Sequence, residues 1–307
     1  MEKLRIVFMG SPDFAVPALR LLAQQYQVVG AVTQPDRPAG RGMQLTPPPV
    51  KAAALELGIP VIQPEKLREP GAYEQLQAWA PDLIIVAAFG QILRKNVLDL
   101  PRYGCVNIHA SLLPRHRGAA PIQAAILEGD RQAGVTIMKM DEGLDTGPMI
   151  SQAAFDLAPD ETGGSLFAKL SSLGGELLMQ TLPGYLAGEL QPVAQPSEGA
   201  SYFGMIRKED GVLDPALPAA VLERKVRAFN PWPGTSLQLP GMPAPLKIHH
   251  ASVQPGHAPA GTRTIRDGLP AIATADGWLL LDEVQPAGKK PMPGKAFLAG
   301  YKGWPTP

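Results

Sequence analysis

Cysteine is almost absent from this sequence. Cys105 is the only cysteine in 307 residues, which excludes a disulfide framework and a zinc site made of thiolates, and predicts a reducing compartment. The five histidines show no metal-ligand spacing with one another or with Cys105, so we expect no metal. Because Cys105 lies in a strand-like run, we expect it to be a small buried apolar side chain.

Long apolar runs are absent as well. The most apolar run, residues 83–89, is far shorter than the roughly 20 residues that cross a membrane as a helix. The chain passes from Met1-Glu2-Lys3 directly into strand-like sequence, without the pattern of a signal or transit peptide. We therefore expect a cytoplasmic protein with no membrane partner.

Three common fingerprints are also missing. The first strand-like run ends at Gly10-Ser11-Pro12 without Gly-x-Gly-x-x-Gly, which counts against a nucleotide-binding oxidoreductase. The sequence has no P-loop and no Gly-x-Ser-x-Gly nucleophile elbow. We interpret Gly10 as a tight turn, with Ser11 and Pro12 at the start of a helix.

A net charge is absent too, since 28 Lys and Arg balance 28 Asp and Glu. The balance hides a gradient. Residues 1–205 carry 16 basic and 20 acidic side chains, a net charge of −4, whereas residues 206–307 carry 12 basic and 8 acidic ones, a net charge of +4. This break in composition predicts a domain boundary near residue 205. The basic part is either a solvated surface or a surface for an anionic partner.

Short apolar runs alternate with helical patterns through the first 205 residues. We expect strands at 4–9, 27–33, 82–88, 104–108 and 134–140, and helices at 14–25, 49–57, 72–80, 120–127 and 165–187. This alternation predicts an α/β domain with a mostly parallel sheet and helices on both faces.

The pattern changes after residue 205. One helix at 219–229 precedes strands expected at 235–239, 246–252, 270–275 and 278–284. The short strands and the turns rich in Pro and Gly predict a smaller β-barrel or sandwich over residues 206–307.

Asn107 and His109 lie where the fourth expected strand of the first domain ends. Two residues apart in an extended chain, they point the same way, at the end of a strand, where open α/β sheets bind ligands. An amide beside an imidazole can hold a carbonyl oxygen that becomes negatively charged. The alternative is a hydrogen-bonded structural pair.

Asp145 lies between two glycines, in a loop after the fifth expected strand. Its carboxylate could pair with His109 and assist proton transfer from an attacking amine. The alternative is a turn in which Asp141 and Asp145 cap the backbone. Amide, imidazole and carboxylate at neighbouring strand ends favour acyl-type transfer without a covalent Ser or Cys intermediate.

Residues 34–49 form a long basic segment rich in Gly and Pro, which we expect to be a loop without structure of its own. Arg37 and Arg41 on such an arm would suit contacts to phosphates or bases. A solvent-exposed loop with no partner is the alternative.

Taken together, these motifs resemble the methionyl-tRNA formyltransferases among the folate-dependent formyltransferases, over about residues 4–300. The segments that carry the resemblance are residues 9–14, 34–42, 87–93, 107–114, 117–123, 134–138, 143–147 and 227–234. The resemblance implies a Rossmann-like catalytic domain over 1–205 and an OB-like tRNA-binding domain over 206–307. Three positions depart from the family pattern, namely His116, Met43-Gln44 and Asp214-Pro215.

The activity implied by the resemblance is formyl transfer from 10-formyltetrahydrofolate to the α-amine of methionyl initiator tRNA, for translation initiation, by a monomer without a metal. The implied catalytic residues are Asn107, His109 and Asp145. The implied folate-binding residues are Phe89, Gly90, Gln91, Ile92, Ser111, Leu112, Leu113, Pro114 and Asp141. The implied tRNA-binding residues are Arg37, Arg41, Lys208, Arg227, Lys289, Lys290 and Lys295.

Other functions stay open at this point. The same chemistry could serve a small amine, such as glycinamide ribonucleotide or an amino sugar-nucleotide, or a hydrolase that releases formate. A non-catalytic RNA-binding protein is a further alternative, in which Asn107, His109 and Asp145 would be idle. The basic C-terminal part and the basic segment at 34–49 favour a tRNA acceptor.

Overall fold

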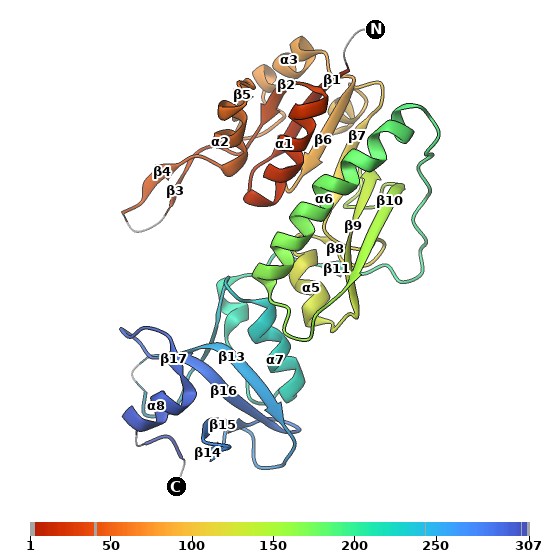
Figure 1. Ribbon diagram of the computed structural model, residues 1–307. Coiled ribbons are helices and arrows are strands. Elements are labelled where there is room, and N and C mark those ends of the chain that lie inside the picture. The colour runs from red at the N-terminus through yellow and green to blue at the C-terminus, as the bar shows by residue number, and fades with distance from the viewer. Residues whose placement is uncertain (1–3, 40–41, 243, 302, 306–307) are drawn as a thin grey trace. The chain divides into compact units, whose positions relative to one another are not determined.

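A computed structural model describes residues 4–39, 42–242, 244–301 and 303–305 (Figure 1). The chain divides into two compact units. Unit 1 comprises Met1–Pro121, Gln132–Asp156 and Phe167–Phe203, and unit 2 comprises Ile122–Arg131, Leu157–Leu166 and Gly204–Pro307. Two of the five divisions fall inside helices, namely α5 (Pro121–Leu127) and α6 (Gly163–Leu186).

Unit 1 is built on a seven-stranded sheet. In sheet order its strands are β10 (Met149–Asp156), β9 (Gln132–Lys139), β7 (Cys105–His109), β6 (Leu83–Ala87), β1 (Arg5–Gly10), β2 (Gln27–Val32) and β5 (Val61–Ile62). The five strands from β7 to β5 run parallel, whereas β9 is antiparallel to both β7 and β10. The predicted mostly parallel sheet is confirmed.

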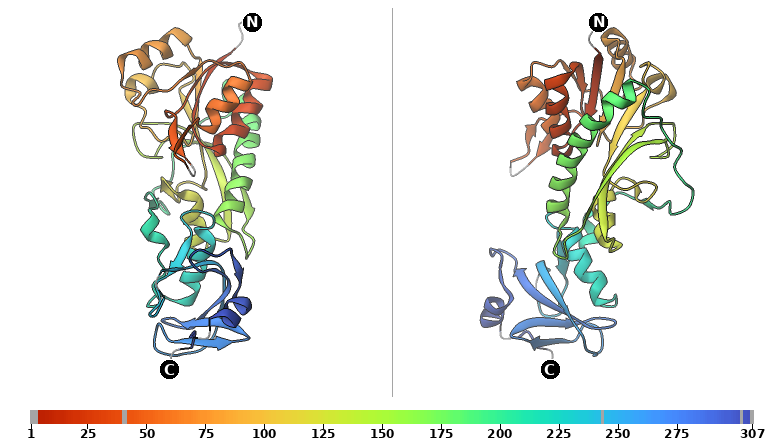
Figure 2. Two further views of the ribbon diagram at one scale, coloured as in Figure 1. Left: turned by 90° about the vertical axis from the view of Figure 1, so that its left-hand side faces the viewer. Right: turned by 45° about the vertical axis from the view of Figure 1, so that its right-hand side comes forward.

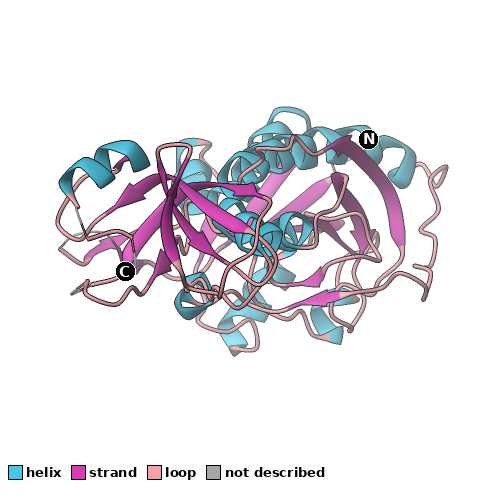
Figure 3. Ribbon diagram, turned by 90° about the horizontal axis from the view of Figure 1, so that it is seen from below, coloured by secondary structure: helices cyan, strands magenta, loops and turns pink. Residues whose placement is uncertain are grey.

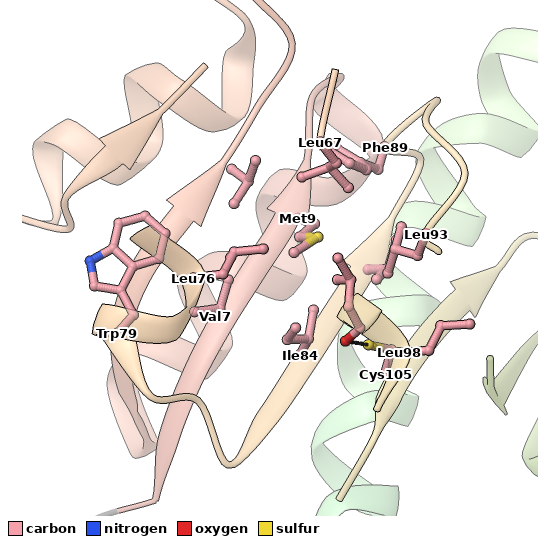
Figure 4. Close-up of a cluster of buried hydrophobic side chains, with 13 residues drawn as sticks. Val7, Met9, Leu67, Leu76, Trp79, Ile84, Phe89, Leu93, Leu98 and Cys105 are labelled. Atoms are coloured by element: carbon pink, nitrogen blue, oxygen red, sulfur yellow. Dashed lines mark hydrogen bonds between the residues drawn. The ribbon is translucent and has the colours of Figure 1, made fainter. Parts of the chain in front are cut away.

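Helices cover both faces of this sheet (Figures 1 and 2). The helices of unit 1 are η1 (Asp13–Ala15), α1 (Val16–Gln25), α2 (Pro49–Glu56), α3 (Pro70–Trp79), α4 (Lys95–Leu98) and most of α6. On one face, Leu76 and Trp79 of α3 pack against Val7 and Met9 in a single buried cluster (Figure 4). On the other, α6 approaches so closely that a Cβ on its Gly174 would lie 2.7 Å from Ile108 Cγ2.

Unit 2 is mainly antiparallel sheet (Figure 3). Its strands are β12 (Thr235–Leu237), β13 (Leu246–Gln254), β16 (Trp278–Gln285), β15 (Leu269–Ala273) and β14 (Arg263–Arg266) in sheet order, with β17 (Met292–Pro293) beside β16. η2 (Lys208–Gly211), α7 (Ala219–Ala228) and α8 (Gly294–Gly300) complete the unit. Its core includes Leu222 and Val226 of α7 and the fully buried Trp304. The predicted smaller C-terminal part built mainly of β-strands after one helix is confirmed.

Two expectations about local structure are wrong. The basic segment at 34–49 is not without structure, because β3 (Arg37–Ala39) pairs with β4 (Gln44–Thr46) as a hairpin. Gly10 is not a turn residue: it ends β1, where a Cβ would lie 2.7 Å from the carbonyl oxygen of Ala87. Close approach of two strands, rather than an unusual backbone angle, requires glycine there. None of the described helices is long and apolar enough to span a membrane.

Cys105 is confirmed as a buried apolar side chain. It is 1% exposed in the cluster of Figure 4, and its thiol donates a weak hydrogen bond to the carbonyl of Val97 at 3.6 Å. Burial raises the pKa of this thiol to about 12.

We predict that Cys105 does not react with a thiol reagent in the folded protein at pH 8, because thiolate and access are both lacking. Titration with a chromogenic disulfide should report no thiol in buffer and one thiol per chain in denaturant. Reaction of the native protein as fast as the unfolded one would contradict the burial of Cys105.

Candidate active site

Asn107 and His109 lie in β7, at the carboxyl end of the parallel strands. Asn107 stands opposite Met138 of β9, and His109 opposite Thr136. Strand alternation puts Asn107 and His109 on one face of the sheet, as predicted. The two side chains belong to residues that are only 8% and 5% exposed. Both are therefore held in a protected position at the strand end.

Both nitrogens of the His109 ring face acceptors. Nε2 lies 3.0 Å from the carbonyl oxygen of His116, and Nδ1 lies 3.7 Å from Oδ1 of Asp145. Because a carbonyl only accepts, Nε2 carries a proton in this arrangement. The Nδ1–Asp145 distance is that of an ion pair rather than of a direct hydrogen bond. Nδ1 thus lies beside a carboxylate that can balance the charge of a protonated ring.

Asp145 is placed by the loop between β9 and β10. Its backbone is left-handed, with φ of +52°, a conformation that Asp tolerates better than most residues. Its Oδ2 accepts a 2.8 Å hydrogen bond from the backbone N–H of Gly118 in β8 (Arg117–Gly118), which leaves Oδ1 toward His109. The carboxylate therefore points at the imidazole and does not cap its own loop.

Asp141 behaves in the opposite way. Its Oδ1 accepts hydrogen bonds from the backbone N–H of Gly143 at 3.0 Å and from the Thr146 hydroxyl at 2.8 Å. The capping turn that the sequence allowed for both aspartates is thus formed by Asp141 alone. Asp141 shapes the loop that carries Asp145.

The residues from Phe89 to Ile92 divide by environment. Phe89 is buried in the cluster of Figure 4, whereas Ile92 is 81% exposed. The Gln91 side chain is bonded to the backbone N–H of Leu67 and the carbonyl of Pro64. Gly90, Gln91 and Ile92 line a cavity of about 540 Å³ whose wall also carries Lys66, Arg68 and Arg94, against the single acid Glu65. The three basic side chains suit this cavity to a ligand with negative charge.

The turn at 111–114 is tied to the protein through its own polar groups. The Ser111 hydroxyl donates to the carbonyl of Arg115 at 2.7 Å, and the Thr136 hydroxyl donates to the carbonyl of Ser111. The N–H of Leu113 bonds Thr136, and the Leu113–Pro114 peptide is cis. Leu112 and Pro114 are half-buried. These hydrogen bonds connect the turn that follows β7 to the neighbouring strand β9.

The basic residues expected to bind tRNA differ in exposure and in their hydrogen bonds. Lys208, Lys289, Lys290 and Lys295 are exposed on unit 2, and Arg37 is exposed on the hairpin of unit 1. Arg227 differs, because its Nε and Nη2 bond the Glu223 carboxylate and its Nη1 donates to the carbonyl of Glu161. Arg41 lies outside the described residues.

Three side chains that were not predicted as site residues are connected to Asp145 by hydrogen bonds, and two of them, Gln195 and Tyr202, lie outside the motifs. Gln195 bonds the backbone of the Asp145 loop, Arg117 bonds Gln195, and Tyr202 bonds Arg117. Gln195 lies 50 residues from Asp145 in an irregular segment, so no local pattern marks it. No group of three or more His, Cys, Asp or Glu side chains suited to a metal occurs in the part of the chain that the structure describes.

An amide, an imidazole and a carboxylate that suit acyl-type transfer thus lie together on a mostly parallel sheet. Comparison with known proteins agrees. A family model described as formyl transferase matches residues 4–182, and one described as formyl transferase, C-terminal domain, matches residues 205–302. The chain therefore belongs to the formyltransferase family of enzymes.

Among its relatives, a methionyl-tRNA formyltransferase of Myxococcus xanthus is 51% identical over 98% of this chain and 96% of its own length. One of Halorhodospira halophila is 50% identical over 97% of this chain and 96% of its own length.

Solved structures share the fold at low identity. An N-formyltransferase of Helicobacter canadensis, in complex with folinic acid and dTDP-3-aminofucose, has a TM-score of 0.64 at 18% identity and covers 92% of this chain and 98% of its own. A methionyl-tRNA formyltransferase of Clostridium thermocellum has a TM-score of 0.55 at 16% identity, with coverages of 82% and 94%.

Gly118 offers a test of how Asp145 is held. With φ of +102°, a Cβ at Gly118 would lie 2.4 Å from the carbonyl oxygen of Phe203. We predict that Gly118→Ala lowers the free energy of unfolding by about 2–3 kcal/mol and displaces the N–H that bonds Asp145. Urea denaturation measures this loss.

The matched control is Gly71→Ala, since a Cβ at Gly71 would meet no atom within 4 Å and the residue lies in the first turn of α3. This control should leave the stability unchanged or slightly raised. Equal stabilities of the two variants would contradict the tight approach at Gly118.

Proposed function

We propose that this enzyme transfers a formyl group from 10-formyltetrahydrofolate to the α-amino group of methionyl initiator tRNA, the reaction that prepares that tRNA for translation initiation. The observation that carries the proposal is the 51% identity to a relative of that name over 98% of the chain, spanning both units. The grouping of Asn107, His109 and Asp145 supports the proposal. Formyl transfer needs a hydrogen-bond donor to the developing oxyanion and a group that carries one proton away from the amine.

In the proposed reaction, the neutral α-amine attacks the formyl carbon. A new C–N bond forms, the bond from that carbon to N10 of the folate breaks, and the proton lost by the amine ends on that folate nitrogen. The formyl oxygen gains negative charge during the attack, and the Asn107 amide donates a hydrogen bond to it.

His109 and Asp145 are proposed to act as a pair. Because Nε2 of His109 faces the His116 carbonyl, Nδ1 is the atom that takes up the moving proton, and only the protonated Nδ1 donates to the formyl oxygen. Asp145, at 3.7 Å from Nδ1, orients the ring and balances the charge of the imidazolium that forms when the ring holds that proton. Burial of His109 strengthens this electrostatic effect.

The donor is proposed to bind along Phe89–Ile92, the 111–114 turn and Asp141. The cavity beside Gly90 supports this part of the proposal, since Lys66, Arg68 and Arg94 give it a positive wall. The glutamate tail of a folate carries carboxylates that such a wall would attract. The pteridine end would then lie toward His109.

The acceptor is proposed to meet two basic surfaces. Residues 1–205 would form the catalytic domain, with Arg37 and Arg41 of the hairpin segment near the tRNA. Residues 206–307 would form the tRNA-binding domain through Lys208, Lys289, Lys290 and Lys295. Arg227 is proposed to support α7 rather than to contact tRNA directly, because its guanidinium bonds the Glu223 carboxylate and the Glu161 carbonyl. We propose that the enzyme acts as a cytoplasmic monomer.

We predict that Asp145→Asn lowers kcat for formyl transfer to methionylated initiator tRNA at least about 100-fold, because the imidazolium loses its counter-charge. Discontinuous assays with 10-formyltetrahydrofolate measure this change. Asp156→Asn is the control: this carboxylate lies in β10 of the same unit, exposed and bonded to Gln132. Full activity of Asp145→Asn would contradict the mechanism, and equally efficient transfer to a small amine would contradict the tRNA acceptor.

We predict that Lys289→Gln together with Lys290→Gln weakens tRNA binding and lowers the slope of log affinity against log salt by up to about 2, since each phosphate contact contributes about 0.7–0.9. Filter binding across a salt series measures the slope. Lys95→Gln removes an exposed lysine of unit 1 outside the proposed set and should leave the slope intact. An unchanged slope in the double variant would exclude this basic surface from the tRNA contact.

A further inference from the structure

We propose that Gln195 is a positioning residue that holds Asp145 at its working distance from His109, and that Arg117 fixes the Gln195 amide for this purpose. The inference rests on the proposed function, since Asp145 acts on His109 in that reaction. Gln195 and Arg117 are thus proposed to act through Asp145 and not on the substrates themselves.

The Gln195 amide bridges two backbone carbonyls of the Asp145 loop. Its Nε2 donates to the carbonyl of Asp145 at 2.8 Å and to the carbonyl of Gly147 at 2.8 Å. One NH₂ group has two protons, so both hydrogen bonds can form together. The loop between Asp145 and Gly147 is thus clamped at both ends of Thr146, in a stretch where no helix or strand fixes the backbone.

Arg117 determines which way the Gln195 amide faces. Its Nε and Nη2 both donate to Gln195 Oε1, at 3.1 and 2.8 Å. A guanidinium only donates, so the amide oxygen must face Arg117 and the NH₂ must face the loop. Arg117 is itself held, because Nη1 donates to the Tyr202 hydroxyl at 2.9 Å and the guanidinium lies 5.5 Å from the centre of that ring. Arg117 is 9% exposed, which protects these bonds from water.

These contacts hold Asp145 from two sides. Arg117 reaches the backbone carbonyl of Asp145 through Gln195, while the next residue, Gly118, donates its N–H to the Asp145 carboxylate at 2.8 Å. The two-residue strand β8 therefore holds Asp145 from the backbone side and from the side-chain side. β8 is anchored in turn by parallel pairing with β11 (Tyr202–Phe203).

These hydrogen bonds are needed to hold Asp145 in place, because Asp145 has a left-handed backbone conformation in a partly exposed loop. Loss of the Gln195 clamp frees the carbonyls of Asp145 and Gly147 and lets the carboxylate move relative to Nδ1 of His109. Misplacement of a reacting group by about 1 Å costs on the order of 100-fold in rate. The effect should appear in kcat, because Gln195 has no proposed contact with either substrate.

The test compares Gln195→Met and Gln195→Glu with wild type in the tRNA formylation assay. Met removes both functions of the amide, whereas Glu keeps an acceptor for Arg117 and removes the NH₂ that bonds the loop. We expect both variants to lower kcat about 10- to 100-fold with KM for each substrate within about twofold. Gln191→Met is the matched control, since Gln191 is exposed in the same unit and bonds only its local Gly188 carbonyl; its kcat should be unchanged.

A cycle with Asp145→Asn separates positioning from a general loss of structure. If Gln195 acts through Asp145, adding Gln195→Met to Asp145→Asn should lower kcat by less than about threefold further. The same 10- to 100-fold loss in both backgrounds, or full activity of Gln195→Glu, would overturn the proposal. The wild-type rate on methionylated tRNA reports separately on the proposed function, because the variant ratios can be measured on whichever amine the enzyme accepts.

Discussion

The hydrogen bond from the Gly118 N–H to the Asp145 carboxylate joins two segments that are 27 residues apart in the sequence. It turns one carboxylate oxygen away and leaves the other facing His109. His109 is fixed independently by β7 and by the His116 carbonyl. The distance between the Asp145 carboxylate and the imidazole therefore depends on how firmly the Asp145 loop is held.

The sheet supplies the other half of this geometry. Parallel β6 and β7 bring Asn107 and His109 to the edge where ligands bind in open α/β sheets. Antiparallel β9 ends beside the start of β7, with Lys139 opposite Val106, and the loop that follows folds back so that Oδ1 of Asp145 lies 3.7 Å from Nδ1 of His109. Thr136 of β9 bonds both Ser111 and Leu113, so the turn after β7 is tied to the strand that precedes the Asp145 loop. The buried cluster of Figure 4 packs against β6 and β7 through Ile84, Val86 and Cys105.

Sequence patterns predicted the buried strands of this fold well, because a short, continuous apolar run such as 83–89 is typical of a strand that is buried on both faces. They did not predict β10, whose alternate residues are exposed and which contains Ser, Gln and Asp, or the β3–β4 hairpin, whose strands are three residues each. Asn107 and His109 were indicated by their place at the end of an expected strand, and Asp145 by its place in the loop after the next one. Gln195 was not, because its role arises only when an irregular segment folds back on a distant loop.

The central claim is that formyl transfer takes place at the Asn107–His109–Asp145 group, and a crystal structure with bound 5-formyltetrahydrofolate tests it most directly. The account predicts the pteridine end and formyl group beside Nδ1 of His109, with the glutamate tail toward Lys66, Arg68 and Arg94. A folate seated away from these three side chains, with its formyl group out of reach of Asn107 and His109, would contradict the account.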